Sequence, residues 1–214
     1  MKKYHSNINK KYPRDMVGYG KKKLRVRWPN NARVALQIVL NYEEGAENCV
    51  LHGDKHSEVF LSEIIGAQPI KGRHMNMESF YEYGSRRGFW RLHEIFQKKK
   101  IPITIFGVGM ALERNKDICS AIKNAGYEVA SHGWRWIDYQ NVSKPKEKKH
   151  MNLAIKSIKK IFGKRPSGWY TGRCSPNTLD LVIEEGGFLY CSDSYSDDLP
   201  YWETRKNKKQ LMIP

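Results

Sequence analysis

The run Arg33–Leu40 (RVALQIVL) constrains the fold most, because it is almost continuously apolar. A strand that is half exposed alternates apolar and polar residues, whereas a parallel strand buried on both faces does not. We therefore expect a parallel strand here, with both of its faces covered. Further strand-like runs follow at Ile103–Val108, Tyr127–Ser131, Gly168–Thr171, Phe188–Ser192 and Leu211–Ile213.

Helical patterns lie between these strand-like runs. They cover Gly88–Lys99, Lys116–Ala125, Ser143–Phe162 and Thr178–Glu185. In the third of them, Ser143 is suited to cap the amino end and Gly163 to end the helix. Strands that alternate with helices predict a parallel sheet or a barrel of βα units.

The composition is that of one domain with a sizeable core, since 40% of the 214 residues are apolar. We expect a basic, irregular leader over residues 1–30 and the domain itself over residues 31–214. No segment is apolar enough to cross a membrane, and no apolar stretch follows the basic amino terminus, so we expect a cytoplasmic protein. The four cysteines lack Cys-x-x-Cys spacing, which indicates reduced thiols and not a zinc or disulfide framework.

The formal net charge of +16 raises the question of nucleic-acid binding. The lysines, however, are dispersed in short runs, and no nucleic-acid-binding motif accompanies them. The aromatic residues gather with acids and glycines instead of alternating with the basic residues. We therefore expect a small-molecule substrate and no specific nucleic-acid partner.

Four polar and aromatic segments each follow one of the expected strands. They are Asn41–Gly45, Ser131–Trp136, Gly172–Asn177 and Asp193–Trp202. The carboxyl ends of parallel strands meet at one edge, where strand–helix folds build their sites, so these segments predict a common pocket. Its candidate catalytic residues are Glu43 and His132. Its candidate substrate-binding residues are Glu44, Trp136, Arg173, Asp193 and Trp202.

The order of these motifs resembles the NodB-type polysaccharide deacetylases. That family has an acidic pair after the first strand, Ser-His after the third, an arginine followed by a proline after the fourth and Asp-Ser after the fifth. The spacing of its arginine and proline is shorter than that of Arg173 and Pro176 in this chain. The segments YPRDMVGYG, VLNYEEGAENCVLHGD and SHGWRWIDYQ are similar, more closely, to the cofactor-independent allantoinases of that superfamily. The resemblance runs from Tyr12 to about Trp202. It implies a deformed (β/α) barrel and hydrolysis of non-peptide carbon–nitrogen bonds, such as the opening of the hydantoin ring of allantoin in purine catabolism.

Two departures from the deacetylase pattern bear on the cofactor. Glu43 and Glu44 stand where metal-dependent members have Asp-Asp, and Trp136 stands where they have the second histidine of His-x-x-x-His. A catalytic zinc normally takes three protein ligands, and an indole cannot be one of them. The sequence therefore favours a cofactor-free enzyme. The alternative is a deacetylase of N-acetylated amino sugars, which would use a divalent metal such as zinc.

The resemblance also implies roles for individual residues. Glu43 matches the family's catalytic base, and His132 could donate a hydrogen bond to the oxyanion or orient the attacking water. Glu44 could raise the pKa of Glu43 or bind substrate nitrogens. Arg173 could balance the carboxylates or bind a ureido oxygen.

The end of the sequence, Gln210–Pro214, looks like the opening of a sixth strand. A closed eight-stranded barrel typically needs about 250 residues, so we expect an incomplete, truncated barrel with about six strands. The resemblance implies a late Leu-x-His segment with the histidine that protonates the leaving group, and none occurs before Pro214. A rival hypothesis is therefore an inactive remnant, or a fragment that needs a complementing carboxyl-terminal fragment or a second copy of itself.

Overall fold

One sheet organises residues 14–214, the part of the chain that the computed structural model describes. Its spatial order is β1-β2-β3-β4-β5-β7-β6. The strands are β1 Val39–Tyr42, β2 Thr104–Gly107, β3 Glu128–Ser131, β4 Gly168–Trp169, β5 Tyr190–Cys191, β6 Tyr201–Arg205 and β7 Lys208–Met212. All neighbouring pairs are parallel except β6 with β7, so the predicted parallel sheet is confirmed.

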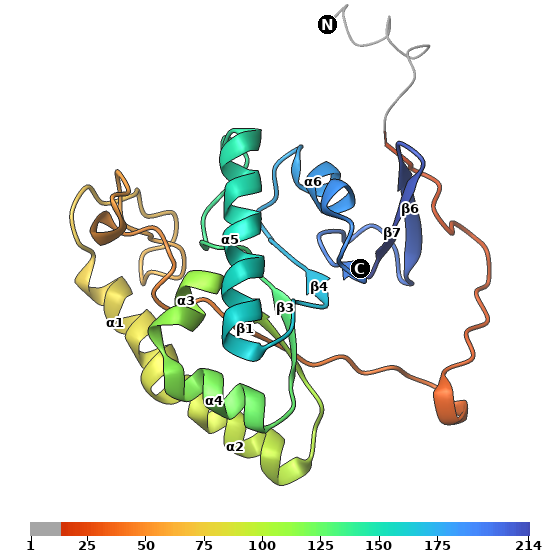
Figure 1. Cartoon of the computed structure of the whole chain (residues 1–214), viewed down its shortest axis with the longest axis horizontal. Coiled ribbons are helices and arrows are strands. Elements are labelled where there is room, and N and C mark those ends of the chain that lie inside the picture. The colour runs from red at the N-terminus through yellow and green to blue at the C-terminus, as the bar shows by residue number, and fades with distance from the viewer. Residues whose placement is uncertain (1–13) are drawn as a thin grey trace, which may run out of the picture.

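Helices connect the strands and cover the sheet (Figure 1). They are α1 Met75–Tyr83, α2 Phe89–Lys99, α3 Gly109–Arg114, α4 Lys116–Asn124, α5 Lys144–Phe162 and α6 Thr178–Glu185. A π-helical segment, η4 Gly84–Gly88, joins α1 to α2, so that the three form one long rod. Two short 3₁₀ turns, η2 Pro29–Asn31 and η3 Val50–His52, lie in the first third of the chain.

The ends of helix α5 lie at residues whose own conformational preferences suit a helix end. Ser143 occupies its amino-cap position, although its side chain makes no capping hydrogen bond, and the chain leaves the helix at Gly163 with φ 76°. That left-handed conformation suits glycine, because a Cβ would be strained there. Along the helix, Met151, Ala154 and Ile158 are buried, which gives the apolar face that holds α5 to the core.

The core lies on both faces of the central strands. On the helix-covered face, Ile105 and Val129 pack in one cluster with Leu112. On the opposite face, Phe106 and Tyr190 belong to a separate cluster. All four residues of β2 are buried, as a central parallel strand requires.

The prediction for the first strand was wrong at its amino end. Pairing begins only at Val39, and Val34 and Leu36 are 74% and 82% exposed. Within the described residues, β1 lies at the edge of the sheet and pairs with β2 alone, so nothing covers the chain that leads into it.

The prediction of about six strands missed β6, whose residues were assigned to a loop. Pairs from Tyr201 with Met212 to Arg205 with Lys208 form an antiparallel hairpin. Its turn, Lys206 and Asn207, has positive φ at both residues, which matches the twist of a two-residue hairpin. The sheet remains open in the described residues, as expected for an incomplete barrel.

The predicted leader lies only partly within the described residues, since residues 1–13 fall outside them. Residues 14–28 form bends, turns and extended chain, and the segment begins beside the hairpin of β6 and β7 (Figure 1). There, the Tyr19 hydroxyl donates to the carbonyl of Pro200 at 2.7 Å, and its backbone N–H donates to Asp197 at 3.0 Å. In residues 14–214 no helix has the length and apolar character that crossing a bilayer would require.

Candidate active site

The first pair of predicted site residues meets at the carboxyl edge of the sheet. Glu43 follows β1 directly and His132 follows β3, so both strands deliver their next side chain to the same edge. His132 Nε2 lies 2.9 Å from Glu43 Oε1, and the Asn41 amide donates to the same oxygen at 3.0 Å. Both contacts fall on Oε1, and no hydrogen bond to Oε2 occurs among the described residues. The His132 side chain is 2% exposed and that of Glu43 is 17% exposed.

Asp193 follows β5 and is held by the loop after β4. Its Oδ1 accepts hydrogen bonds from the backbone N–H groups of Thr171 at 2.7 Å and Gly172 at 2.8 Å. Burial raises the pKa of Asp193, while those two N–H groups and the nearby His132 act in the opposite direction. Asp193 Oδ2 and His132 Nδ1 are both buried and have no hydrogen-bond partner within residues 14–214. Buried polar atoms are rarely left so, which marks these two side chains as candidates for a functional role.

Glu44 turns away from this pair toward the helical rod. Its Oε2 accepts the backbone N–H of Glu43 at 2.9 Å, and its carboxyl group lies directly against Gly84 of η4. Burial is the main reason that the pKa of Glu44 rises to about 7. Next to Gly84, the Ser85 hydroxyl bonds to that of Tyr42 at 2.9 Å, so η4 contacts the chain on both sides of Glu43.

Trp136 and Arg173 form a second contact of predicted residues. The Arg173 guanidinium lies 3.8 Å from the centroid of a Trp136 ring and 5.2 Å from that of Phe60. Glu58 accepts a hydrogen bond from Arg173 at 3.1 Å. Arg173 is thus fixed as a cation over the face of a buried indole.

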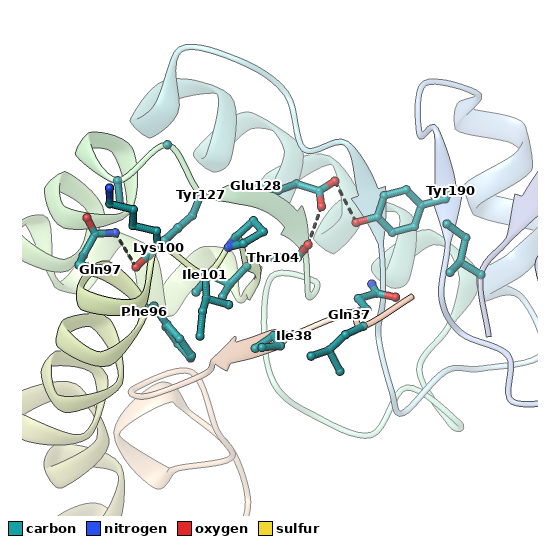
Figure 2. A pocket seen from close by; sticks show the side chains of 16 residues that line it. Gln37, Ile38, Phe96, Gln97, Lys100, Ile101, Thr104, Tyr127, Glu128 and Tyr190 are labelled. Carbon is teal, nitrogen blue, oxygen red and sulfur yellow. Dashed lines mark hydrogen bonds between the residues drawn. The ribbon is translucent and has the colours of Figure 1, made fainter. Parts of the chain in front are cut away.

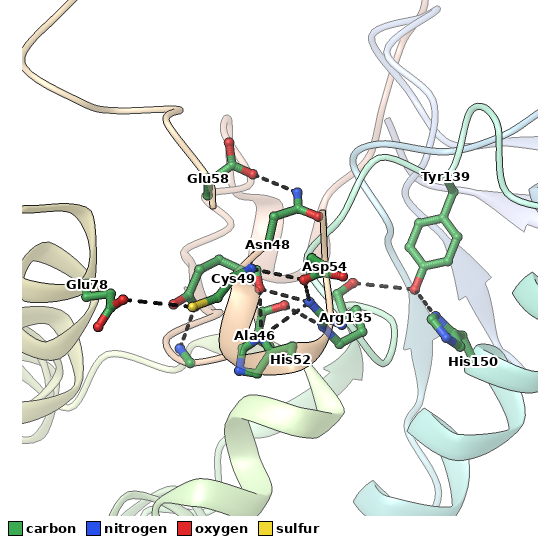
Figure 3. A network of polar contacts seen from close by, with 12 residues as sticks. Ala46, Asn48, Cys49, His52, Asp54, Glu58, Glu78, Arg135, Tyr139 and His150 are labelled. Carbon is green, nitrogen blue, oxygen red and sulfur yellow. Dashed lines mark hydrogen bonds and ion pairs between the residues drawn. The ribbon is translucent and has the colours of Figure 1, made fainter. Parts of the chain in front are cut away.

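Arg135 is a residue that the sequence did not single out, although it lies inside the Ser131–Trp136 segment. Figure 3 shows it at the centre of a polar network. It donates to the carbonyls of Ala46 at 3.0 Å and Glu47 at 2.9 Å, and it pairs with Asp54 at 2.5 Å. These bonds tie the loop that follows Glu43 to the loop that carries His132, and so fix their separation.

The structure therefore divides the predicted site residues into groups. Glu43, His132 and Asp193 share the carboxyl edge of the sheet, and Trp136 stacks with Arg173. Glu44 faces the helices. Trp202 lies on β6 and is 63% exposed, and no contact among the described residues links it to Glu43 or His132.

The donor atoms present do not suit a three-ligand catalytic metal. In residues 14–214 no three His, Cys, Asp or Glu side chains converge as metal ligands do. The residue four positions after His132 is Trp136, and the cationic Arg173 covers the face of its indole. The positive charge of Arg173 would repel a metal cation bound next to Trp136.

Comparison with known proteins decides the family. The model of the polysaccharide deacetylase family matches residues 76–184. The chain belongs to the polysaccharide deacetylase family. A Schizosaccharomyces pombe protein classed with these deacetylases is 40% identical over 200 residues, which make up 88% of this chain and 62% of that protein. A peptidoglycan deacetylase from Helicobacter pylori is 27% identical over 117 residues, or 54% of this chain and 40% of that protein.

Two solved structures of the same fold are more similar still. PuuE allantoinase is 55% identical with a TM-score of 0.91, over 95% of this chain and 68% of that one. A probable polysaccharide deacetylase from Pseudomonas aeruginosa is also 55% identical with a TM-score of 0.90, over 95% of this chain and 69% of that one. This polysaccharide deacetylase family member therefore has the predicted NodB-type (β/α) barrel architecture, in a hydrolytic family. The two structures carry different activities in their names, so similarity alone does not assign the substrate.

Proposed function

We propose that this chain is an allantoinase-like cyclic amidohydrolase that hydrolyses the hydantoin ring of allantoin to give allantoate, without a metal ion. The observation that carries the proposal is the contact between Glu43 and His132, in a chain that has Trp136 where the resemblance expects the second histidine of a metal-dependent deacetylase. A carboxylate and an imidazole suit acid–base hydrolysis of an amide-type bond. The 55% identity to PuuE allantoinase supports the choice of substrate.

In the proposed reaction, Glu43 is the base that accepts a proton from the attacking water. His132 and Asn41 bond to Oε1 of Glu43, so Oε2 is the oxygen that takes the proton. The water oxygen forms a bond to the ring carbonyl carbon, and the carbon–nitrogen bond of the ring then breaks. Holding the carboxylate in one orientation favours the reaction, because the base is aligned before the water arrives.

The other residues act on the charges that this reaction creates. The His132 imidazole contacts Oε1 of Glu43 through Nε2, and we assign it to orienting the base and, through the base, the attacking water. Arg173 supplies a fixed positive charge over Trp136, at the same edge of the sheet. Glu44 holds the backbone N–H of Glu43, and we assign it to positioning the base. The leaving nitrogen must take up a proton, and the donor of that proton is not assigned.

The test is conversion of allantoin to allantoate by the purified 214-residue chain after exhaustive treatment with a chelator. The same sample is offered an N-acetylated chito-oligosaccharide, with and without added zinc. We expect allantoin turnover that resists the chelator and no release of acetate. Zinc-dependent release of acetate would favour the deacetylase alternative. A folded sample that is inactive on both substrates would favour an inactive remnant or a fragment that needs a partner.

A further inference from the structure

The His132 imidazole is held by a hydrogen bond on one side only. Its Nε2 lies 2.9 Å from Glu43 Oε1, whereas Nδ1 is buried and has no hydrogen-bond partner within residues 14–214. In an imidazole that works with a carboxylate, a hydrogen bond at the second nitrogen usually fixes the orientation of the ring. Since the described part of the chain supplies no such bond, packing of the ring has to fix the direction in which Nε2 points.

Two aromatic rings pack on His132 and on each other. The centroid of the Tyr170 ring lies 4.9 Å from that of His132, and the Phe106 centroid lies 6.5 Å from it. Tyr170 and Phe106 are stacked, with their centroids 4.8 Å apart and their planes inclined by 30°. These are distances of favourable aromatic pairs. Phe106 lies on β2 and is buried, so it gives Tyr170 a rigid backing.

The backbone and the hydroxyl of Tyr170 hold its ring in this place. Tyr170 directly follows β4, and its backbone N–H donates to the carbonyl of Ser131, the residue before His132, at 2.9 Å. At the far end of the ring, its hydroxyl lies 3.0 Å from that of Tyr195. Gly172 leaves room for this hydroxyl, because a Cβ on Gly172 would lie 2.9 Å from it. Tyr170 is therefore fixed at both ends beside the imidazole.

The Tyr170 hydroxyl is a neutral group that already has a partner. Burial is the main reason that the pKa of Tyr170 is raised, and the hydrogen bond with Tyr195 acts in the same direction. The hydroxyl thus keeps its hydrogen at neutral pH. What Tyr170 places against His132 is its ring, and a phenylalanine would supply the same ring.

We propose that Tyr170 is a positioning residue, whose ring holds the His132 imidazole so that Nε2 faces Glu43. The inference rests on the proposed function for the roles of Glu43 and His132, but the packing itself needs no substrate. Without the ring, the imidazole is free to turn. Its bond to Glu43 then weakens, and the base is less well aligned.

Two variants of the full 214-residue chain test this role by steady-state kinetics with allantoin. Tyr170→Phe keeps the ring and should change kcat by less than about twofold. Tyr170→Leu removes the ring and should lower kcat by about tenfold or more. KM should change far less, because alignment of the base acts on the reaction and not on binding. Tyr170→Met takes the place of Tyr170→Leu if circular dichroism shows that the latter does not fold.

Tyr127→Leu is the matched control. Tyr127 precedes β3, whereas His132 follows it, so the two lie at opposite ends of the same strand. Tyr127 also packs on a histidine, with a centroid distance of 5.7 Å to His93, and Gln97 donates to its hydroxyl at 2.9 Å (Figure 2). Its loss should lower stability but change kcat by less than about twofold.

A second measurement needs no turnover. Glu43 Oε1 is an acceptor, so Nε2 of His132 carries the hydrogen between them. This hydrogen is buried and should exchange slowly with water, which NMR of isotope-labelled histidine measures. The signal of His132 is the one that disappears in His132→Gln. We expect exchange to be about tenfold or more faster in Tyr170→Leu and unchanged in Tyr170→Phe and Tyr127→Leu.

Unchanged exchange in a folded Tyr170→Leu would overturn the proposal, whatever the activity. Equal losses of kcat in Tyr170→Phe and Tyr170→Leu would also overturn it, because they would assign the effect to the hydroxyl. So would an equal effect of Tyr127→Leu, which would indicate a general loss of stability. If the wild type does not hydrolyse allantoin but shows the expected exchange pattern, the proposed function fails and the positioning of His132 by Tyr170 stands.

Discussion

The guanidinium of Arg173 lies 3.8 Å from the centroid of the Trp136 ring, and Glu58 holds it there from the other side at 3.1 Å. The stack joins the loop after β4 to the loop after β3. It also places a fixed positive charge over the indole four residues after His132.

Replacing Arg173 by Lys should weaken this stack, because an ammonium group lacks the flat face that lies over the indole. We expect the free energy of unfolding to fall by about 1 kcal/mol and the tryptophan emission to change. Urea denaturation followed by fluorescence measures both. Arg86→Lys is the control, since that side chain is 76% exposed, and equal effects in the two variants would refute the role of the stack.

Replacing Glu43 by Gln removes the proposed base but keeps its shape and its bond to Asn41. Turnover of allantoin should fall by at least about 100-fold, while the free energy of unfolding changes little. Steady-state kinetics and urea denaturation are the measurements. Glu63→Gln, at an exposed position, should leave both unchanged. Retained turnover in Glu43→Gln would remove Glu43 as the base.

Glu44 should make the stability of the protein depend on pH. Its pKa is about 7 in the folded chain against an ordinary value of 4.5, so the folded state binds the proton more tightly. The resulting stabilisation is fully present below about pH 4.5 and is lost as the pH rises through 7. From pH 5 to pH 8, the wild type should therefore lose up to about 3 kcal/mol relative to Glu44→Gln. Urea denaturation at both pH values tests this, and parallel curves for the two proteins would contradict it.

Gly84 should not tolerate a side chain, whereas Gly88 in the same π-helical segment should. A Cβ on Gly84 would collide with the carboxyl group of Glu44, but one on Gly88 would meet its nearest neighbour at 3.7 Å. We expect Gly84→Ala to lower the free energy of unfolding by about 1–2 kcal/mol. Gly88→Ala should raise it by about 0.5–1 kcal/mol, because alanine favours helix. A thermal or urea unfolding series measures both, and the same sign for the two variants would be the contrary result.

The parts of the fold that the sequence predicted are those with local signals. The helix Thr178–Glu185 has the predicted bounds, and α5 lies between the predicted cap Ser143 and Gly163. The hairpin strand β6 was missed because its residues are mostly exposed and its turn, Lys206-Asn207, contains no glycine or proline. Helix α1 was also missed, since Met77 is its one buried residue and its apolar pattern is weak.

The sequence predicted which candidate site residues lie together where the ends of strands position them. It did not predict the orientation of side chains that depends on packing against residues far away in the sequence. Glu43, His132 and Asp193 each follow a strand, and parallel strands bring them to one edge. The orientation of Glu44 depends on Gly84, forty positions later, which has room for a carboxyl group only because it lacks a side chain. The bonds of Arg135 to Ala46 and Glu47 depend on backbone carbonyls, which carry no sequence signal.

The π-helical segment η4 also sets the rotational phase of the rod in which it lies. Successive residues of an α-helix turn by about 100°, so one extra residue in a regular α-helix would rotate α2 against α1, whereas a π-helical turn absorbs it. Met77 on α1 faces the loop that follows Glu43, whereas Phe89 and Phe96 on α2 face the main core. The wide turn of η4 takes up one residue more than an α-helical turn would, and it keeps both faces in place. Deleting one residue there should therefore let the segment close to α-helix with little change of phase, whereas inserting one should turn one of these faces away from its partner.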